Sequence, residues 1–264
     1  VNFRALPTGG RLRFSAGGFR DGALPDWNAS SPYRCQRLLS GSERWRSIEE
    51  LLSEAAKKGS KIVVLPELSV DPETLRKLRE WLRREHRRHG FSLVVAGSFH
   101  LEVEGGDGSR LRRGVASLLD GYGEEILRHT KLRPMRVGTN GEFLEEDIEG
   151  GSQVELLHFG FGLLGLAICL DFCEESRVPI KDLWVAIEPA LLLVPSMGAE
   201  STNNAHHRKA EALARQCGAV TVVASQHPKE PEALGLRWGG KDAKPQRETP
   251  ILHGVITWPG WDGA

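Results

Sequence analysis

The sequence places a carboxylate, an ammonium group and a thiol at the ends of three apolar runs. Glu67 follows KIVVLP, Lys131 follows EILRHT, and Cys169 closes GLLGLAIC. A thiol can attack a carbonyl carbon, a carboxylate can accept its proton, and an ammonium group can stabilise a developing oxyanion. Glu67, Lys131 and Cys169 are therefore candidate catalytic residues for the transfer of an acyl group.

The segments around these residues alternate between helical and strand patterns. Apolar residues recur at helical spacing on both sides of KIVVLP, namely Trp45, Ile48, Leu52 and Ala55 before it, and Leu75, Leu78, Trp81 and Leu82 after it. The runs KIVVLP, LVVAGSF, ALLLVPS and AVTVVAS are typical of strands buried on both faces. This alternation predicts an α/β fold with largely parallel sheet. Because loops diverge at the carboxyl ends of such strands, we expect the three candidate residues to meet in one pocket.

Antiparallel additions to the sheet are also expected. Segments 154–159 and 162–169 are separated by a short glycine-containing turn, which predicts a hairpin and hence mixed sheet. Residues 1–40 are rich in Gly, Pro, Ser and Arg, with one strand candidate at 12–14, and are predicted to be an irregular lead-in. Residues 41–264 are predicted to be one domain whose last part, from about residue 226, is an irregular tail apart from HGVITW.

Three motifs together resemble a known family. VVLPEL around Glu67, HTKLRP around Lys131 and GLAICLDF around Cys169 are similar, in order and separation, to the signature motifs of the nitrilase, or carbon-nitrogen hydrolase, superfamily. The resemblance spans residues 45–226 and implies a four-layer αββα sandwich with mixed sheets. It also implies hydrolysis of a non-peptide C–N bond through a thioester on Cys169, with Glu67 as general base. Lys131 and the backbone N–H of Leu170 would stabilise the oxyanion, and no metal or organic cofactor would be required.

The resemblance also implies a second glutamate downstream of the lysine. In GEF, Glu142 has a setting similar to a Gly-Glu-aromatic motif of some branches, while Glu145 and Glu146 are close alternatives. After the nucleophile, Leu170 and Asp171 resemble the Cys-x-Asp of amidase branches more than the Cys-Trp-Glu of true nitrilases. The expected substrate is therefore a small amide, with nitriles and carbamoyl compounds as alternatives.

A second hypothesis is that the chain is a nitrilase-like scaffold or sensing module, alone or within a longer polypeptide, with vestigial or conditional catalysis. The first residue, Val1, and the atypical ends of the sequence motivate it. Its distinguishing property would be an inert Cys169, because an enzyme of the proposed type needs a reactive thiol.

Composition narrows the possible partners. Lysine plus arginine equals aspartate plus glutamate at 35 each, so no net charge favours nucleic acid or an anionic membrane. RKLREWLRREHRRHG is locally basic, but its apolar stripe predicts a helix that packs on the sheet and turns its charges to solvent. The expected ligand is a small molecule, and nucleic-acid contact is not favoured.

The remaining expectations concern location and assembly. The four scattered cysteines and the lack of a long apolar stretch predict a cytoplasmic protein without a membrane span. The family resemblance implies a homodimer or a larger even-numbered oligomer, for which Leu183, Trp184 and Ile187 offer an apolar surface. The pair His206 and His207 is expected at the exposed start of a surface helix.

Overall fold

A computed structural model of the chain describes residues 11–19, 25–27, 34–38, 41–106, 108–139, 142–173, 183–198, 200–226, 234–238 and 251–257. The first of its two large sheets has the strand order β15 (Ile251–Thr257), β1 (Arg11–Gly17), β4 (Ile62–Val64), β5 (Leu93–Glu104), β6 (Arg110–Asp120), β7 (Glu125–Thr130). The second has the order β10 (Leu156–Phe159), β11 (Gly162–Leu166), β12 (Leu191–Met197), β13 (Val220–Gln226), β14 (Leu234–Trp238). Two small hairpins pair β2 (Pro25–Trp27) with β3 (Cys35–Leu38) and β8 (Arg136–Thr139) with β9 (Glu142–Glu145).

Both large sheets mix parallel and antiparallel pairs. Strand β4 is parallel to β1 and β5, and β12 is parallel to β11 and β13, whereas the β5–β6, β6–β7 and β10–β11 pairs are antiparallel. The β10–β11 pair confirms the predicted hairpin, although β11 ends at Leu166, before Cys169.

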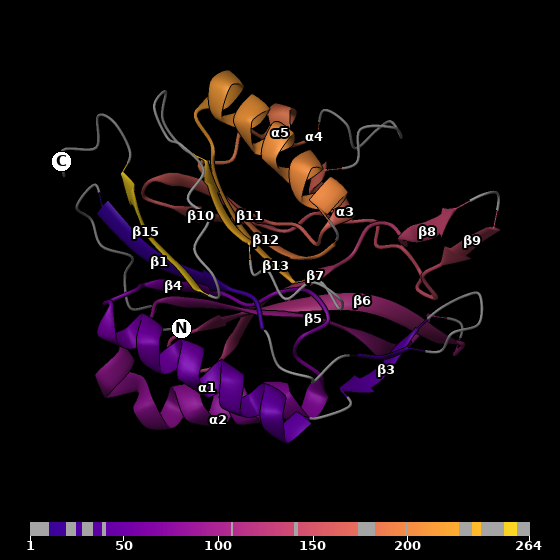
Figure 1. Ribbon diagram of the computed structural model, residues 1–264, viewed down its shortest axis with the longest axis horizontal. Helices are drawn as coiled ribbons and strands as arrows, with labels where there is room; N and C mark the ends of the chain where they lie inside the picture. The colour runs from indigo at the N-terminus through magenta and orange to yellow at the C-terminus, as the bar shows by residue number, and fades with distance from the viewer. Residues whose placement is uncertain are drawn as a thin grey trace.

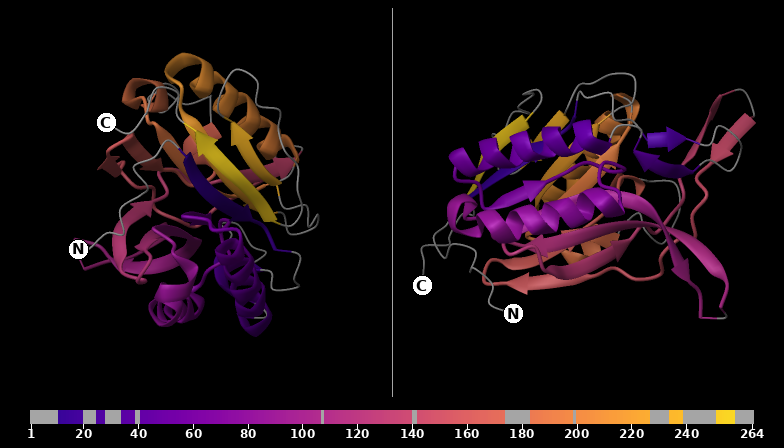
Figure 2. Two further views of the ribbon diagram at one scale, coloured as in Figure 1. Left: turned by 90° about the vertical axis from the view of Figure 1, so that its left-hand side faces the viewer. Right: turned by 90° about the horizontal axis from the view of Figure 1, so that it is seen from below.

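Helices cover the outer face of each sheet (Figures 1 and 2). Helices α1 (Gly41–Lys57) and α2 (Pro72–His89) lie on the first sheet. On the second lie α3 (Leu170–Cys173), α4 (Leu183–Ile187) and α5 (Glu200–Cys217). The layers therefore follow the order α, β, β, α, which confirms the expected four-layer sandwich with mixed sheets.

The continuous apolar runs of the central strands follow from burial on both faces. In β4, Ile62 and Val64 pack between the sheets while Val63 packs under α1 and α2. In β12, Leu193 packs between the sheets and Leu192 packs under the second helical layer. Successive side chains of a strand point to opposite faces, so a strand with two covered faces is apolar at every position.

Regular structure begins before residue 41, within the stretch predicted to be an irregular lead-in. Strand β1 lies inside the first sheet, between β4 and β15, and its residues Leu12, Phe14 and Ala16 belong to the core between the sheets. Strands β14 and β15 likewise lie in the predicted tail. The pairing of β15 with β1 joins two segments at opposite ends of the sequence. The position of β15 in the sheet therefore could not be read from its local sequence pattern.

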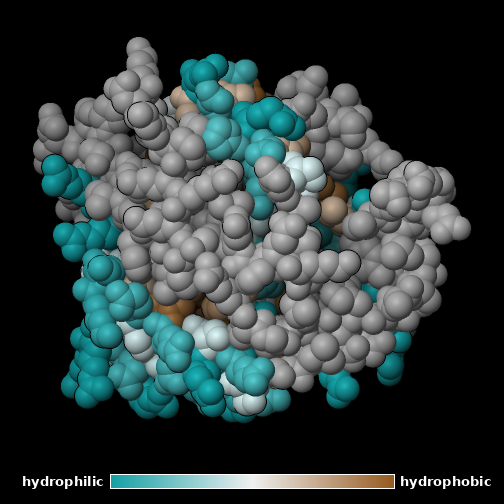
Figure 3. All heavy atoms as spheres, in the orientation of Figure 1, coloured by the Kyte–Doolittle hydropathy of each residue, from teal (hydrophilic) through white to brown (hydrophobic). Residues whose placement is uncertain are grey.

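The outer surface of the first helical layer is hydrophilic (Figure 3). Several basic residues of α2 form ion pairs, including Arg76 with Glu80 and Arg83 with Glu124. None of the described helices is long and apolar enough to cross a membrane.

Trp184, expected at an oligomer face, is instead fully buried and donates its indole N–H to the carbonyl of Asp171 at 2.9 Å.

Candidate active site

Glu67, Lys131 and Cys169 lie together between the ends of the two sheets. Lys131 Nζ donates to Glu67 Oε1 at 2.8 Å, and the Cys169 thiol lies close enough to the Glu67 side chain to affect its pKa. All three residues are buried, with exposed fractions of 3%, 2% and 0%. The structure thus brings together the three residues that the strand ends had suggested.

The end of β12 holds both Cys169 and Glu67 by their backbones. The N–H of Cys169 donates to the carbonyl of Pro195 at 2.9 Å, and the N–H of Glu67 donates to the carbonyl of Ser196 at 3.3 Å. Cys169 has φ of 48° and Leu68, next to Glu67, has φ of 54°. Left-handed backbone is costly for residues other than glycine and concentrates at functional sites, where the surrounding structure enforces it.

Leu170 begins α3 directly after this turn. The first N–H groups of a helix have no acceptor within the helix. The N–H of Leu170, the residue after Cys169, is therefore available to an acceptor from outside the helix.

Of the three candidates for the second glutamate, Glu146 contacts the lysine. Lys131 Nζ donates to Glu146 Oε2 at 2.7 Å, on top of its bond to Glu67. Glu145 is bound to Arg136 near the surface. Glu142 begins β9, where its backbone pairs with Thr139, and its side chain lies outside the described part of the structure.

Three donors converge on the Glu146 carboxylate. Besides Lys131, the N–H of Met135 donates to Oε2 at 2.8 Å, and His100 Nε2 lies 2.8 Å from Oε1. His100 Nδ1 accepts the N–H of Cys35 at 3.0 Å, so the proton of a neutral ring lies on Nε2 and is donated to Glu146. Glu146 is thereby held as an anion.

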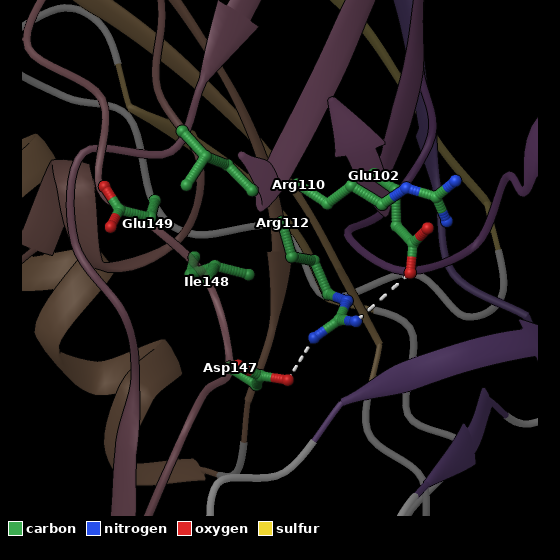
Figure 4. Close-up of a pocket in the computed structure, with 7 residues that line it drawn as sticks. Glu102, Arg110, Arg112, Asp147, Ile148 and Glu149 are labelled. Atoms are coloured by element: carbon green, nitrogen blue, oxygen red, sulfur yellow. Dashed lines mark hydrogen bonds and ion pairs between the residues drawn. The ribbon is translucent and has the colours of Figure 1, made fainter. Parts of the chain in front are cut away.

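The segment after Glu146 is fastened to β6 at a neighbouring surface pocket (Figure 4). Arg112 lies between the carboxylates of Asp147 and Glu102 and forms an ion pair with each. The backbone N–H of Glu149 also donates to the carbonyl of Arg112 at 2.7 Å. These contacts hold the segment that carries Glu146 against Lys131. The catalytic candidates themselves do not line this pocket.

The two glutamates beside Lys131 have different acidities. Burial raises the pKa of Glu67, and Lys131 opposes this only in part. Burial acts in the same direction on Glu146, but Lys131 and His100 outweigh it and lower the pKa of Glu146 to about 2. A pair of carboxylates whose pKa values are pushed apart divides into a proton acceptor and a permanent anion. Glu67 is suited to the first role and Glu146 to the second.

The cation and the thiol also have shifted pKa values. Burial disfavours the charged lysine, but the carboxylates of Glu146 and Glu67 prevail and raise the pKa of Lys131 well above its ordinary value. Burial and the charge of Glu67 raise the pKa of the Cys169 thiol well above its ordinary value. At neutral pH the site therefore holds a protonated thiol and a cationic lysine beside the Glu67 side chain.

A second buried cluster joins the lysine segment to the turn that carries Cys169. Asp171 accepts the N–H of Leu132 at 3.0 Å and lies 3.2 Å from His129 Nε2, while His129 Nδ1 lies 2.9 Å from Glu155. Although burial lowers it, these two carboxylates raise the pKa of His129 to about 9. His129 is therefore an imidazolium between two anions, and it fixes the relative position of β7 and α3.

Sequence reasoning missed several buried polar residues around the site. His100 and Ser196 belong to apolar strands, and Gln226 ends β13 and donates its amide to the carbonyl of Glu67 at 2.8 Å. A polar residue inside or at the end of a strand buried on both faces was the available signal. His206, expected at an exposed helix start, is instead fully buried against Phe172.

Within the described ranges, no group of three or more His, Cys, Asp or Glu side chains is arranged to hold a metal ion.

Comparison with known proteins identifies the family. The family model of carbon-nitrogen hydrolases matches residues 33–177, more than half of the chain, so the chain belongs to the carbon-nitrogen hydrolase family. It is thus an enzyme of the class that hydrolyses C–N bonds, as the three motifs had suggested. No curated protein matches the chain by sequence.

Solved structures share the fold at low sequence identity. A cysteine-to-alanine mutant of an amidase of the nitrilase superfamily from Nesterenkonia is 19% identical, with a TM-score of 0.65, over 98% of this chain and 94% of that chain. A second mutant of that amidase, with the acetamide moiety of fluoroacetamide added to its active-site cysteine, is also 19% identical, with a TM-score of 0.64 over the same shares. The NitFhit protein of C. elegans is 19% identical, with a TM-score of 0.64, over 94% of this chain and 61% of that chain.

Proposed function

We propose that the chain hydrolyses a small amide through a thioester on Cys169. The observation that carries this proposal is the contact of Lys131 with both Glu67 and Glu146, beside the Cys169 thiol. Glu67 is the general base, Lys131 stabilises the oxyanion, and Glu146 takes the role of the second glutamate in place of Glu142. The amidase-like sequence after the nucleophile, with Asp171 two residues on, favours an amide over a nitrile.

In the first half of the reaction Cys169 is acylated. Glu67 takes the thiol proton as sulfur attacks the carbonyl carbon, and the carbonyl oxygen becomes an oxyanion held by Lys131 and the N–H of Leu170. The carbon–nitrogen bond then breaks, and the nitrogen leaves with the proton from Glu67. The products of this half are ammonia or an amine and a thioester.

In the second half the thioester is hydrolysed. Water attacks the thioester carbon, Glu67 takes one proton from the water, and the same donors hold the oxyanion. When the carbon–sulfur bond breaks, the sulfur recovers its proton and a carboxylic acid is released. Glu146 keeps its charge throughout, because its three donors hold it as an anion.

The proposal is tested by incubating the protein with aliphatic and aromatic amides and the matching nitriles. The measurements are ammonia release and the mass of the peptide that contains Cys169. We expect an acyl adduct on Cys169 and steady ammonia release with at least one small amide. Cys169→Ala should abolish both, whereas Cys173→Ala, which removes a second buried cysteine four residues away, should leave them intact. A Cys169 that forms no adduct with any compound would favour the scaffold hypothesis.

A further inference from the structure

A serine and a histidine outside the lysine network described above also contact the Cys169 sulfur, the serine directly and the histidine through it. Ser196 Oγ lies 3.4 Å from Cys169 Sγ and 2.7 Å from His206 Nε2. Ser196 is near the end of β12, and its carbonyl accepts the N–H of Glu67. Ser196, His206 and Cys169 are all fully buried, so water does not compete for these contacts at the surface.

The surroundings of His206 decide which of its nitrogens carries the proton. Burial lowers the pKa of His206 to about 3, so the ring is neutral and has one N–H. Among the residues that the structure describes, none is a hydrogen-bond partner for Nδ1. A buried N–H without an acceptor is rarer and costlier than a bare lone pair. The proton therefore belongs on Nε2, which donates to Ser196 Oγ.

The Ser196 hydroxyl then donates a hydrogen bond to its other neighbour, the Cys169 sulfur. Because its oxygen accepts from His206, the hydroxyl donates to the Cys169 sulfur. A hydrogen bond to an anion is roughly twice as strong as one between neutral groups, so this donor favours the thiolate over the thiol. It opposes the burial and the carboxylate charge that disfavour the thiolate.

We propose that Ser196 and His206 are positioning residues that aim a hydroxyl hydrogen at the Cys169 sulfur and stabilise the thiolate during attack. The inference rests on the proposed function, in which Cys169 is the nucleophile. No proton leaves the pair: the thiol proton passes to Glu67, Ser196 keeps its own proton, and His206 stays neutral. His206 acts only through Ser196.

The test is the pH dependence of Cys169 alkylation by iodoacetamide, followed by mass spectrometry of the peptide that contains it. Ser196→Ala should raise the midpoint of the profile by about one pH unit, which is about tenfold in rate below the midpoint. Ser196→Thr, which keeps the hydroxyl, should restore the parental profile. The matched control is Ser225→Ala, because Ser225 is paired with Ser196 across β12 and β13 and is equally buried.

The histidine is tested by two further variants. His206→Leu removes the donor to Ser196 and should shift the profile in the same direction, whereas His206→Gln supplies an amide N–H and should reverse most of the shift. In a Ser196→Ala background, His206→Leu should cause no further shift, because its effect passes through the hydroxyl. If Ser196→Ala does not fold, the comparison of His206→Leu with His206→Gln still decides the question.

The outcomes separate the two proposals. If parental Cys169 is alkylated and Ser196→Ala gives the same profile as Ser225→Ala, the inference about Ser196 and His206 is overturned and the proposed function stands. An additional shift from His206→Leu in the Ser196→Ala background would overturn the inference that His206 acts only through Ser196. A parental Cys169 that iodoacetamide does not alkylate at any pH would overturn the nucleophile assignment and this inference with it.

Discussion

The Nζ of Lys131 lies 2.7 Å from Glu146 Oε2 and 2.8 Å from Glu67 Oε1, so one buried cation joins two carboxylates of different acidity. Glu146 accepts two further hydrogen bonds, from Met135 N–H and His100, which satisfy its charge. The Glu67 side chain accepts from Lys131 and lies beside the Cys169 thiol. This asymmetry leaves Glu67 able to exchange a proton while Glu146 holds the lysine in place.

Glu67→Gln should slow acylation by roughly two to four orders of magnitude, the usual scale for general acid–base catalysis. The amide keeps the shape of the side chain and a carbonyl oxygen for Lys131, but it cannot accept the thiol proton. Single-turnover acylation of the variant and the parent, with the substrate found by the adduct screen, is the measurement. Acylation at the parental rate would remove Glu67 from the mechanism.

Glu146→Gln should lower turnover by about ten- to a hundredfold, because Lys131 loses one of its two anionic partners and shifts in the pocket. The variant should also be less stable, since a buried cation loses part of its compensation. The measurements are steady-state turnover and denaturant unfolding.

Two matched variants decide among the glutamates. Glu145→Gln breaks a surface pair with Arg136 and should change turnover little. Glu142→Gln tests the residue that the GEF motif favoured. A large loss of turnover in Glu142→Gln together with parental turnover in Glu146→Gln would reverse our choice of the second glutamate.

The layered architecture could be predicted because burial on two faces leaves a strong local pattern. Apolar runs such as 62–65 and 191–194 are typical of central strands with both faces covered, and the helices between them have clear apolar stripes. The place of β1 was harder to predict, because it depends on pairing with β4 and with β15, about 240 residues further along the chain. Its alternating RLRFSAG pattern identified a strand candidate but not its neighbours.

The site could be predicted in part for a similar reason. Glu67, Lys131 and Cys169 each follow an apolar run, so their positions at strand ends could be read from the sequence. The choice among Glu142, Glu145 and Glu146 depends on the path of the β8–β9 hairpin, which no periodicity specifies. His206 was misjudged because a polar pair at a helix start usually faces solvent, and its contact with Ser196 is purely tertiary.

Gly97→Ala should destabilise the fold and impair the site together. Gly97 has φ of +61°, and an added Cβ would lie 2.3 Å from the carbonyl oxygen of Pro66, the residue before Glu67. The strained backbone costs about 1 kcal/mol or more, and relief of the clash must displace either β5 or the segment that carries Glu67. Gly106→Ala is the control, because nothing lies within 4 Å of its added Cβ. Unfolding midpoints and turnover that are equal in the two variants would contradict this explanation.

His129 should make stability depend on pH in the alkaline range. Its pKa in the folded protein is about 9, against 6.5 for an ordinary histidine, because Asp171 and Glu155 stabilise the imidazolium despite its burial. A group whose pKa is raised by folding stabilises the protein fully below its unfolded pKa. That contribution is lost as the pH rises through the folded value. The window for His129 therefore runs from about pH 6.5 to about pH 9.

The free energy of unfolding, measured in urea at intervals across this window, should fall by on the order of 3 kcal/mol from this residue alone. His129→Gln should be less stable than the parent at pH 6.5 and should show a much flatter dependence, because glutamine cannot be protonated. His86→Gln, which changes a histidine on the outer helix α2, should keep the parental slope. Parallel pH profiles for the parent and His129→Gln would show that the contacts of His129 with Asp171 and Glu155 do not require its charge. Turnover should fall over the same window, since the imidazolium fixes the Lys131 segment against the turn of Cys169.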